Sequence, residues 1–209
     1  MLNLFKKYPL LYSENDQNKY EQYIKDNIGF YKSVFHEIYS PDLHIDIAVI
    51  EPTKEKDYYT LVTIGMGAYK MKVPVEQGRL NRAELAIRLP KDWNINSNEE
   101  KWYWPMRVLK ILARMPISEN TWLGLYHDAD FGNYFSEDTK LCGVLLDSFD
   151  EKLNFFKLKN GDQLAVYNVL PIYREEMEYK NKTNAESLLS KMDEKTIKGP
   201  LDINRKNVV

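Results

Sequence analysis

The sequence predicts an α+β fold with a mostly antiparallel mixed sheet and helices packed against it. Residues 16–38 and 104–116 carry apolar side chains at helical spacing, whereas most of the other apolar segments alternate as strands do. The order is helix, strands, helix, strands, helices, which differs from the regular strand–helix repeat of a parallel sheet. The 209 residues, 44% of them hydrophobic, are enough for one continuous core. We therefore expect a single domain.

The first half of the chain should supply one helix and three neighbouring strands. The helix at 16–38 presents its apolar stripe to the sheet, with Asn15 or Asp16 available as its cap. Strands are expected at 44–50, 58–66 and 83–89, because apolar and polar residues alternate there. In this register the buried positions are Ile45, Ile47, Val49, Leu85 and Ile87. The outward positions are Arg82, Glu84 and Arg88.

The second half should begin with a helix at Trp104 and Pro105, since proline is tolerated in a first turn. Four further strands are expected, at 122–126, 141–146, 154–158 and 163–170. Two helices follow, one from 172 to about 180 and one from 185. We predict an N-terminal segment at 1–15, the α+β domain at 16–194 and a loose polar tail at 195–209.

Composition and charge restrict the kind of partner. The chain has 29 lysine and arginine residues against 31 aspartate and glutamate residues, so no global field attracts nucleic acid or an anionic membrane. No run reaches the roughly 18 apolar residues of a membrane span, and the N-terminus lacks the features of a signal peptide. A single cysteine, Cys142, suits a reducing compartment. We expect a cytoplasmic protein.

Gly65 and Gly67 follow a predicted strand and raise the possibility of a phosphate-binding loop. A dinucleotide loop needs a third glycine three residues later, where this chain has Lys70, and a helix to follow. The next segment contains Pro74 and leads into another strand. The pattern favours a corner between two strands.

Few residues could carry catalytic chemistry. His127 lies beside Asp128 and Asp130, and such a group could bind a metal or act as acid and base. No second histidine occurs at ligand spacing, and Cys142 lies within an apolar strand that favours a buried, inert thiol. We therefore predict no enzyme, no metal and no cofactor, with a metal-dependent hydrolase as an alternative.

Several segments in order resemble the suppressor of fused (SUFU) domain family, over about residues 35–195. They are HIDI at 44–47, LVTIGMG at 61–67, RAELAIRLP at 82–90, WP at 104–105, LAR at 112–114, ENTWLG at 119–124, NVLPIYREE at 168–176 and AESLL at 185–189.

The resemblance implies a single SUFU-like domain without catalytic residues. Animal members clasp a peptide with the help of a second domain, for which this chain is too short. Bacterial single-domain members resemble immunity proteins, or antitoxins, that neutralise a polymorphic toxin by direct binding. A regulator that binds another cytoplasmic protein is the alternative.

The predicted partner-binding surface joins the loop at 65–80 to an acidic loop at 126–138. Met66, Tyr69 and Met71 would serve as apolar anchors. Asp128 and Asp130, with Glu137 and Asp138, would face basic residues of a toxin. The outward face of Arg82, Glu84 and Arg88 is the second candidate surface. The oligomeric state remains open.

Overall fold

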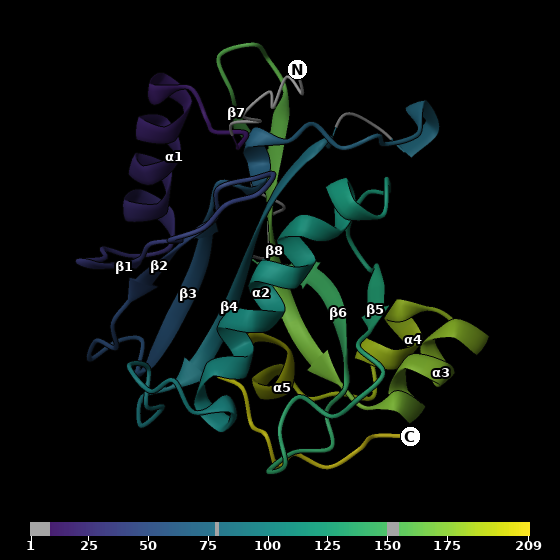
Figure 1. Cartoon of the computed structure of the whole chain (residues 1–209). Helices are drawn as coiled ribbons and strands as arrows, with labels where there is room; N and C mark the ends of the chain where they lie inside the picture. The colour runs from purple at the N-terminus through teal and green to yellow at the C-terminus, as the bar shows by residue number, and fades with distance from the viewer. Residues whose placement is uncertain (1–8, 78–79, 150–154) are drawn as a thin grey trace, which may run out of the picture.

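The computed structural model describes residues 9–77, 80–149 and 155–209 (Figure 1). Its centre is one sheet of eight strands in the order β1-β2-β3-β4-β8-β6-β5, with β7 also paired to β8. Among the strand pairs of the described residues, only β4–β8 is parallel, so the sheet is mixed and mostly antiparallel, as predicted. The strands are β1 (Ser33–Phe35), β2 (Asp46–Ile50), β3 (Tyr58–Ile64), β4 (Arg82–Pro90), β5 (Asp128–Asp130), β6 (Gly143–Ser148), β7 (Phe155–Lys157) and β8 (Gln163–Ile172).

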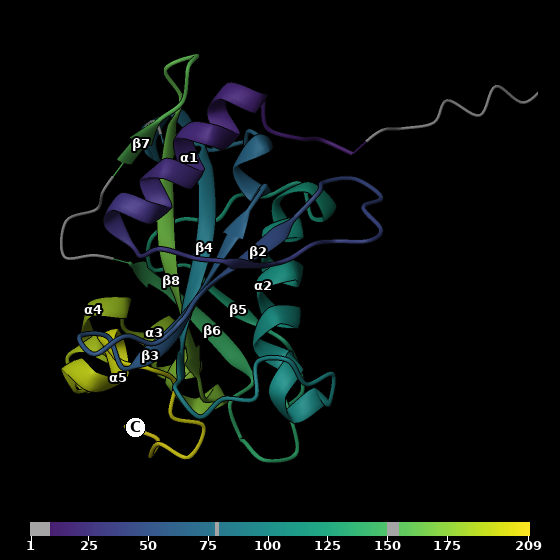
Figure 2. The ribbon, with the colours of Figure 1, turned by 90° about the vertical axis from the view of Figure 1, so that its left-hand side faces the viewer.

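Helices cover both faces of this sheet (Figure 2). The long helix α2 (Glu100–Ser118) lies on one face, over side chains such as Leu85 and Ile87 of β4. The opposite face carries α1 (Glu14–Asn27) and, nearer the C-terminal end of β8, α3 (Arg174–Lys182), α4 (Ala185–Leu189) and α5 (Glu194–Lys198). The domain is thus a helix–sheet–helix sandwich in which the central strands are buried on both sides.

The predicted arrangement of residues 44–89 is confirmed in its main feature. β2, β3 and β4 are adjacent antiparallel strands, and Ile45, Ile47, Val49, Leu85 and Ile87 are buried together under α2. The alternation also places Glu84 and Arg88 on the other face. The expectation that this second face meets solvent was wrong: Glu84 is 0% exposed and Arg88 is 9% exposed.

Several predicted boundaries differ from the structure. The helix expected at 16–38 ends at Asn27, and β1 follows because Ser33–Phe35 pairs with β2; Phe35 still packs on the core, but from a strand. The strand expected at 58–66 ends at Ile64, and a single 3-10 turn, η1 (Met66–Ala68), follows. A second turn of this kind, η2 (Val75–Gln77), precedes β4.

The segment 122–126, expected to be a strand, is a loop. Asn120 and Tyr126 adopt positive φ angles of 52° and 65°, which interrupt an extended strand at both sides of the segment. The strand comes later, at β5, inside the stretch predicted to be an acidic loop. The next strand, β6, begins near its predicted position.

The tail at 195–209 is packed against the domain and differs from the loose segment predicted. It includes most of α5, and the Leu201 amide donates to the Arg88 carbonyl at the end of β4. Arg205 forms an ion pair with Glu176, whose side chain is fully buried. A buried carboxylate without a cation is strongly destabilising, so this pair fixes the tail.

No helix in the described part of the chain is long and apolar enough to span a bilayer.

Candidate functional site

The corner between β3 and η1 binds a carboxylate of the protein itself. The backbone N–H groups of Gly65 and Gly67 donate to Glu84 Oε1 at 2.9 and 3.0 Å. The Tyr12 hydroxyl donates to the same oxygen at 2.5 Å, and the Thr63 hydroxyl donates to Oε2 at 2.5 Å. The two amides that a phosphate loop would offer to a ligand are therefore used internally.

Both glycines are required by close packing around this carboxylate. Gly65 has a φ angle of +130°, and a Cβ atom there would lie 2.0 Å from the backbone oxygen of His44. At Gly67 a Cβ atom would lie 1.9 Å from the Tyr12 hydroxyl. Real Cβ atoms do not approach other atoms so closely. A side chain at Gly65 would therefore displace the backbone of the corner, and one at Gly67 would push the Tyr12 hydroxyl away from Glu84.

Arg82 holds the outer side of the same corner. Its Nη1 donates to the carbonyl oxygens of Gly67 and Ala68, at 2.8 and 2.9 Å, and its Nε donates to Asp162 at 2.9 Å. Burial opposes ionisation of Asp162, but hydrogen bonds from Lys70 and Arg82 lower its pKa to about 2. Burial raises the pKa of Glu84 to about 7, a rise that its four hydrogen-bond donors limit.

Arg88 is also part of the interior. Its guanidinium donates to Asn168 Oδ1 at 3.2 Å and to the Phe149 carbonyl at 2.9 Å, and it lies 4.2 Å from the centre of the Phe149 ring. The outward face predicted for Arg82, Glu84 and Arg88 is therefore absent. These residues connect strands to the segments that cover them, because α1 and the Phe149 side chain pack on this face.

The apolar anchors predicted in the loop at 65–80 are mostly core residues. Met66 is 2% exposed and Met71 is 4% exposed, and Tyr69 is half-buried against the same cluster. The amide of Leu123 donates to the Met71 sulfur at 3.4 Å, which ties this loop to the segment after α2. Met66 and Met71 cannot contact a partner without opening the core.

The predicted acidic group is largely neutralised by α3. Asp128 pairs with Lys180, and Asp130 pairs with Arg174 at 2.9 Å. A hydrogen bond from the Gly132 amide, together with Arg174, lowers the pKa of Asp130. Because β5 is an edge strand beside α3, these carboxylates stabilise a contact between elements.

His127 packs against Trp122, with the ring centres 4.1 Å apart, and burial lowers its pKa. Among the described residues no group of three His, Cys, Asp or Glu side chains could hold a metal ion. The buried thiol of Cys142 has a raised pKa, because burial disfavours the thiolate.

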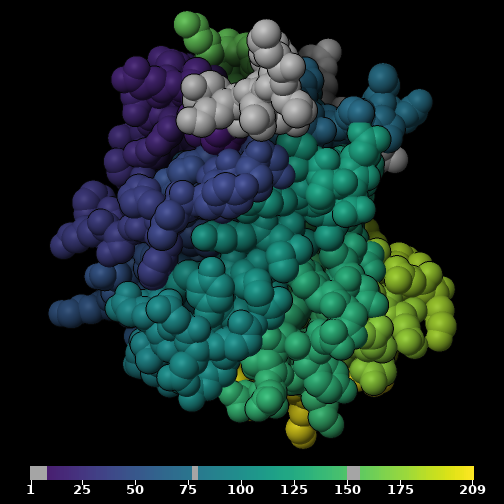
Figure 3. Space-filling model, in the orientation of Figure 1, coloured from purple at the N-terminus to yellow at the C-terminus, as the bar shows by residue number. Residues whose placement is uncertain are grey.

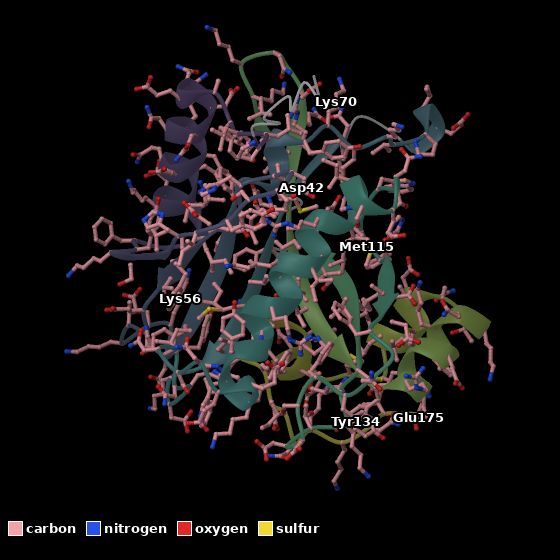
Figure 4. The ribbon with its side chains drawn as sticks, viewed as in Figure 1. Asp42, Lys56, Lys70, Met115, Tyr134 and Glu175 are labelled. Carbon is pink, nitrogen blue, oxygen red and sulfur yellow. The ribbon has the colours of Figure 1, made fainter. Side chains whose placement is uncertain are left out.

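An open groove of about 780 Å³ lies elsewhere, between the first turns of α2 and residues 133–138. Figure 3 shows these two segments, in teal and green, at the lower part of one face. Tyr134 borders the groove and is 59% exposed. Figure 4 labels Lys70 near the upper end of the molecule and Tyr134 near the lower end. Tyr134 and Lys70 therefore lie far apart, although Met71 of the first loop contacts Leu123, just before the second loop.

Lining residues of this groove fell only partly within the sequence prediction. Glu137 and Asp138 were included in the acidic loop, but Tyr134 was not singled out. Glu99 and Glu100 contribute from the N-cap and first residue of α2, which is distant in sequence. Only tertiary structure brings these two segments together.

Comparison with known proteins identifies the family. The model of the suppressor of fused protein (SUFU) family matches residues 41–206. The chain belongs to the SUFU family. An uncharacterized protein of Ureaplasma parvum serovar 3 is 30% identical over 183 residues, which cover 86% of this chain and 90% of that protein.

Solved SUFU structures share the fold. A SUFU homologue from Neisseria gonorrhoeae matches with a TM-score of 0.67 and 17% identity, over 94% of this chain and 98% of that one. A chain of the Sufu–Fu complex matches with a TM-score of 0.67 and 14% identity, over 96% of this chain and 93% of that one. Drosophila Suppressor of Fused matches with a TM-score of 0.58 and 15% identity, over 79% of this chain but only 43% of that protein.

Proposed function

We propose that this SUFU-family chain is a non-catalytic protein-binding domain that acts as an immunity protein, neutralising a toxin domain by direct binding. The observation that carries the binding role is the shared fold with a chain of the Sufu–Fu complex, in which a SUFU protein is bound to a protein partner. The contacts of Glu84, Asp128 and Asp130 agree with a non-catalytic domain, because these carboxylates are used in hydrogen bonds and ion pairs within the fold.

The immunity role rests on the sequence resemblance, because bacterial single-domain members of the family resemble immunity proteins. A bacterial chain, the Neisseria gonorrhoeae homologue, is among the solved structures that match over nearly their whole length. A regulator that binds another cytoplasmic protein is the alternative, and the partner distinguishes the two.

Genomic context and a protection assay test this proposal. We expect the neighbouring gene to encode a secreted protein with a C-terminal toxin domain. Co-expression of this chain with that domain should restore growth, and the two purified proteins should form a stable complex. The control is a SUFU-family chain that is not encoded beside this toxin domain. A neighbouring toxin domain that this chain neither binds nor neutralises would contradict the immunity role.

A further inference from the structure

We infer that the groove between α2 and residues 133–138 is the docking surface for a partner segment rich in lysine or arginine. This inference rests on the proposed function, because it names the surface through which the protein partner is bound. Ten residues line the groove, four acidic and two basic: Glu99, Glu100, Lys101, Arg107, Asn133, Tyr134, Phe135, Ser136, Glu137 and Asp138.

Both walls of the groove are held in place. The Arg107 side chain, from α2, donates to Glu100 Oε1 at 2.7 Å and to the Phe135 carbonyl at 3.1 Å, which connects the two walls. Phe135 stacks on Trp104 with ring centres 4.7 Å apart and an interplanar angle of 6°. The Thr139 hydroxyl donates to the Ile203 carbonyl at 2.8 Å. A preformed surface loses little conformational entropy when a partner binds.

The charge of the groove favours a cationic partner. Lys101 forms an ion pair with Glu99 at 3.2 Å, and Arg107 forms an ion pair with Glu100. Glu137 and Asp138 remain, both exposed and without an ion pair to any residue that the structure describes. The N-terminus of α2 would by itself attract anions, but Glu99 and Glu100 already lie at that end. Glu137 and Asp138, the acidic rim of the groove, therefore favour a partner segment with positive charge.

Tyr134 supplies the apolar anchor beside these carboxylates. Its ring can cover the methylene stems of lysine or arginine while their charged ends reach Glu137 and Asp138. Tyrosine is enriched among interface residues that dominate binding energy. Ser136 also lines the groove, and its buried hydroxyl oxygen has no hydrogen-bond partner among the described residues.

The same features disfavour nucleic acid, whose phosphates would meet an acidic rim. The whole chain has a net charge of only −2, so long-range attraction contributes little and the local carboxylates must provide the preference. Asp128 and Asp130 do not compete for this role because α3 already pairs with them. A basic protein segment is the occupant that fits the shape, the anchor and the charge.

The test compares variants of the groove with matched variants elsewhere. Tyr134→Ala and the double variant Glu137→Gln/Asp138→Asn change the groove. Tyr39→Ala removes another exposed tyrosine, and Glu178→Gln/Glu186→Gln removes two exposed carboxylates from α3 and α4. The probes are the neighbouring toxin domain and a short synthetic peptide of lysine and leucine. A peptide of glutamate and leucine, which carries the opposite charge, is the control for the lysine peptide.

We expect Tyr134→Ala to weaken binding of the toxin domain about thirtyfold. Glu137→Gln/Asp138→Asn should slow association on the order of tenfold and reduce its salt dependence, while both matched variants bind as the wild type does. The lysine peptide should shift amide resonances at 133–138 and at the start of α2, and the glutamate peptide should not.

The outcomes separate the two proposals. If the wild type neutralises the toxin and both groove variants bind it as tightly, the docking surface lies elsewhere and the inference is wrong, while the immunity role stands. If the wild type does not bind the toxin, the immunity role fails. The peptide titration then tests the docking surface alone. If the lysine peptide shifts the amide resonances equally in Glu137→Gln/Asp138→Asn and in Glu178→Gln/Glu186→Gln, the inference is wrong.

Discussion

Replacement of Glu84 by alanine is expected to lower the free energy of unfolding by about 4 kcal/mol at pH 6. The change leaves four buried donors without their acceptor: the hydroxyls of Tyr12 and Thr63 and the amides of Gly65 and Gly67. Each unsatisfied buried donor costs roughly 1–3 kcal/mol, and partial relaxation of the corner reduces the sum. Denaturant unfolding of both proteins measures the difference.

The Glu84→Gln variant is the matched control, because it keeps the shape and one acceptor oxygen but cannot ionise. Burial raises the pKa of Glu84 from an ordinary value of 4.5 to about 7. The folded state therefore binds the proton more tightly than the unfolded state, and this contribution is complete below about pH 4.5 and lost as the pH rises through about 7.

Relative to Glu84→Gln, the wild type should thus lose about 3 kcal/mol of stability between pH 4.5 and pH 8. Other titrating groups cancel in this comparison. A difference between the two proteins that stays constant over this range would show that Glu84 does not titrate as described. Equal stability of the alanine variant and the wild type would show that the hydrogen bonds to Glu84 at the corner do not stabilise the fold.

Gly65→Ala is expected to cost at least about 3 kcal/mol, through backbone strain and a clash. A Cβ atom at this position would lie 2.0 Å from the His44 backbone oxygen. That backbone cannot retreat easily, since the His44 amide donates to the Leu10 carbonyl and the next amide donates to Glu37. Unfolding by denaturant, with near-UV circular dichroism to report on packing, checks the expectation.

Gly161→Ala is the control for conformational strain alone. Gly161 also has a positive φ angle, +85°, but a Cβ atom there would have nothing within 4 Å. This variant should lose only about 1 kcal/mol. If the two alanine variants are destabilised equally, the packing of the corner against His44 contributes nothing, contrary to our account.

The fold could be predicted largely because its strands follow local periodicity. Burial of Ile45, Ile47 and Leu85 was readable from alternation, and the amphipathic stripe located α1. The end of α1 was not readable, because apolar residues continue at helical spacing beyond Asn27. Only pairing with β2 shows that Ser33–Phe35 is a strand.

The site was harder to predict because it depends on contacts between distant segments. Alternation put Glu84 on the second face of β4, but the sequence does not show that α1 and Tyr12 cover it. Likewise, the sequence around Asp128 is typical of a solvated loop, and only the structure shows that α3 places Lys180 beside it. The two glycines of the corner were the one local signal, because they marked a corner between two strands.

Amide hydrogen exchange on the complex with the neighbouring toxin domain tests the central claim most directly. The account predicts that binding slows exchange at residues 133–138 and in the first turns of α2, and leaves the corner at Gly65–Gly67 and the edge strand β5 unchanged. Protection confined to β5, to β1 or to the loop at 65–77, with none at 133–138, would contradict it.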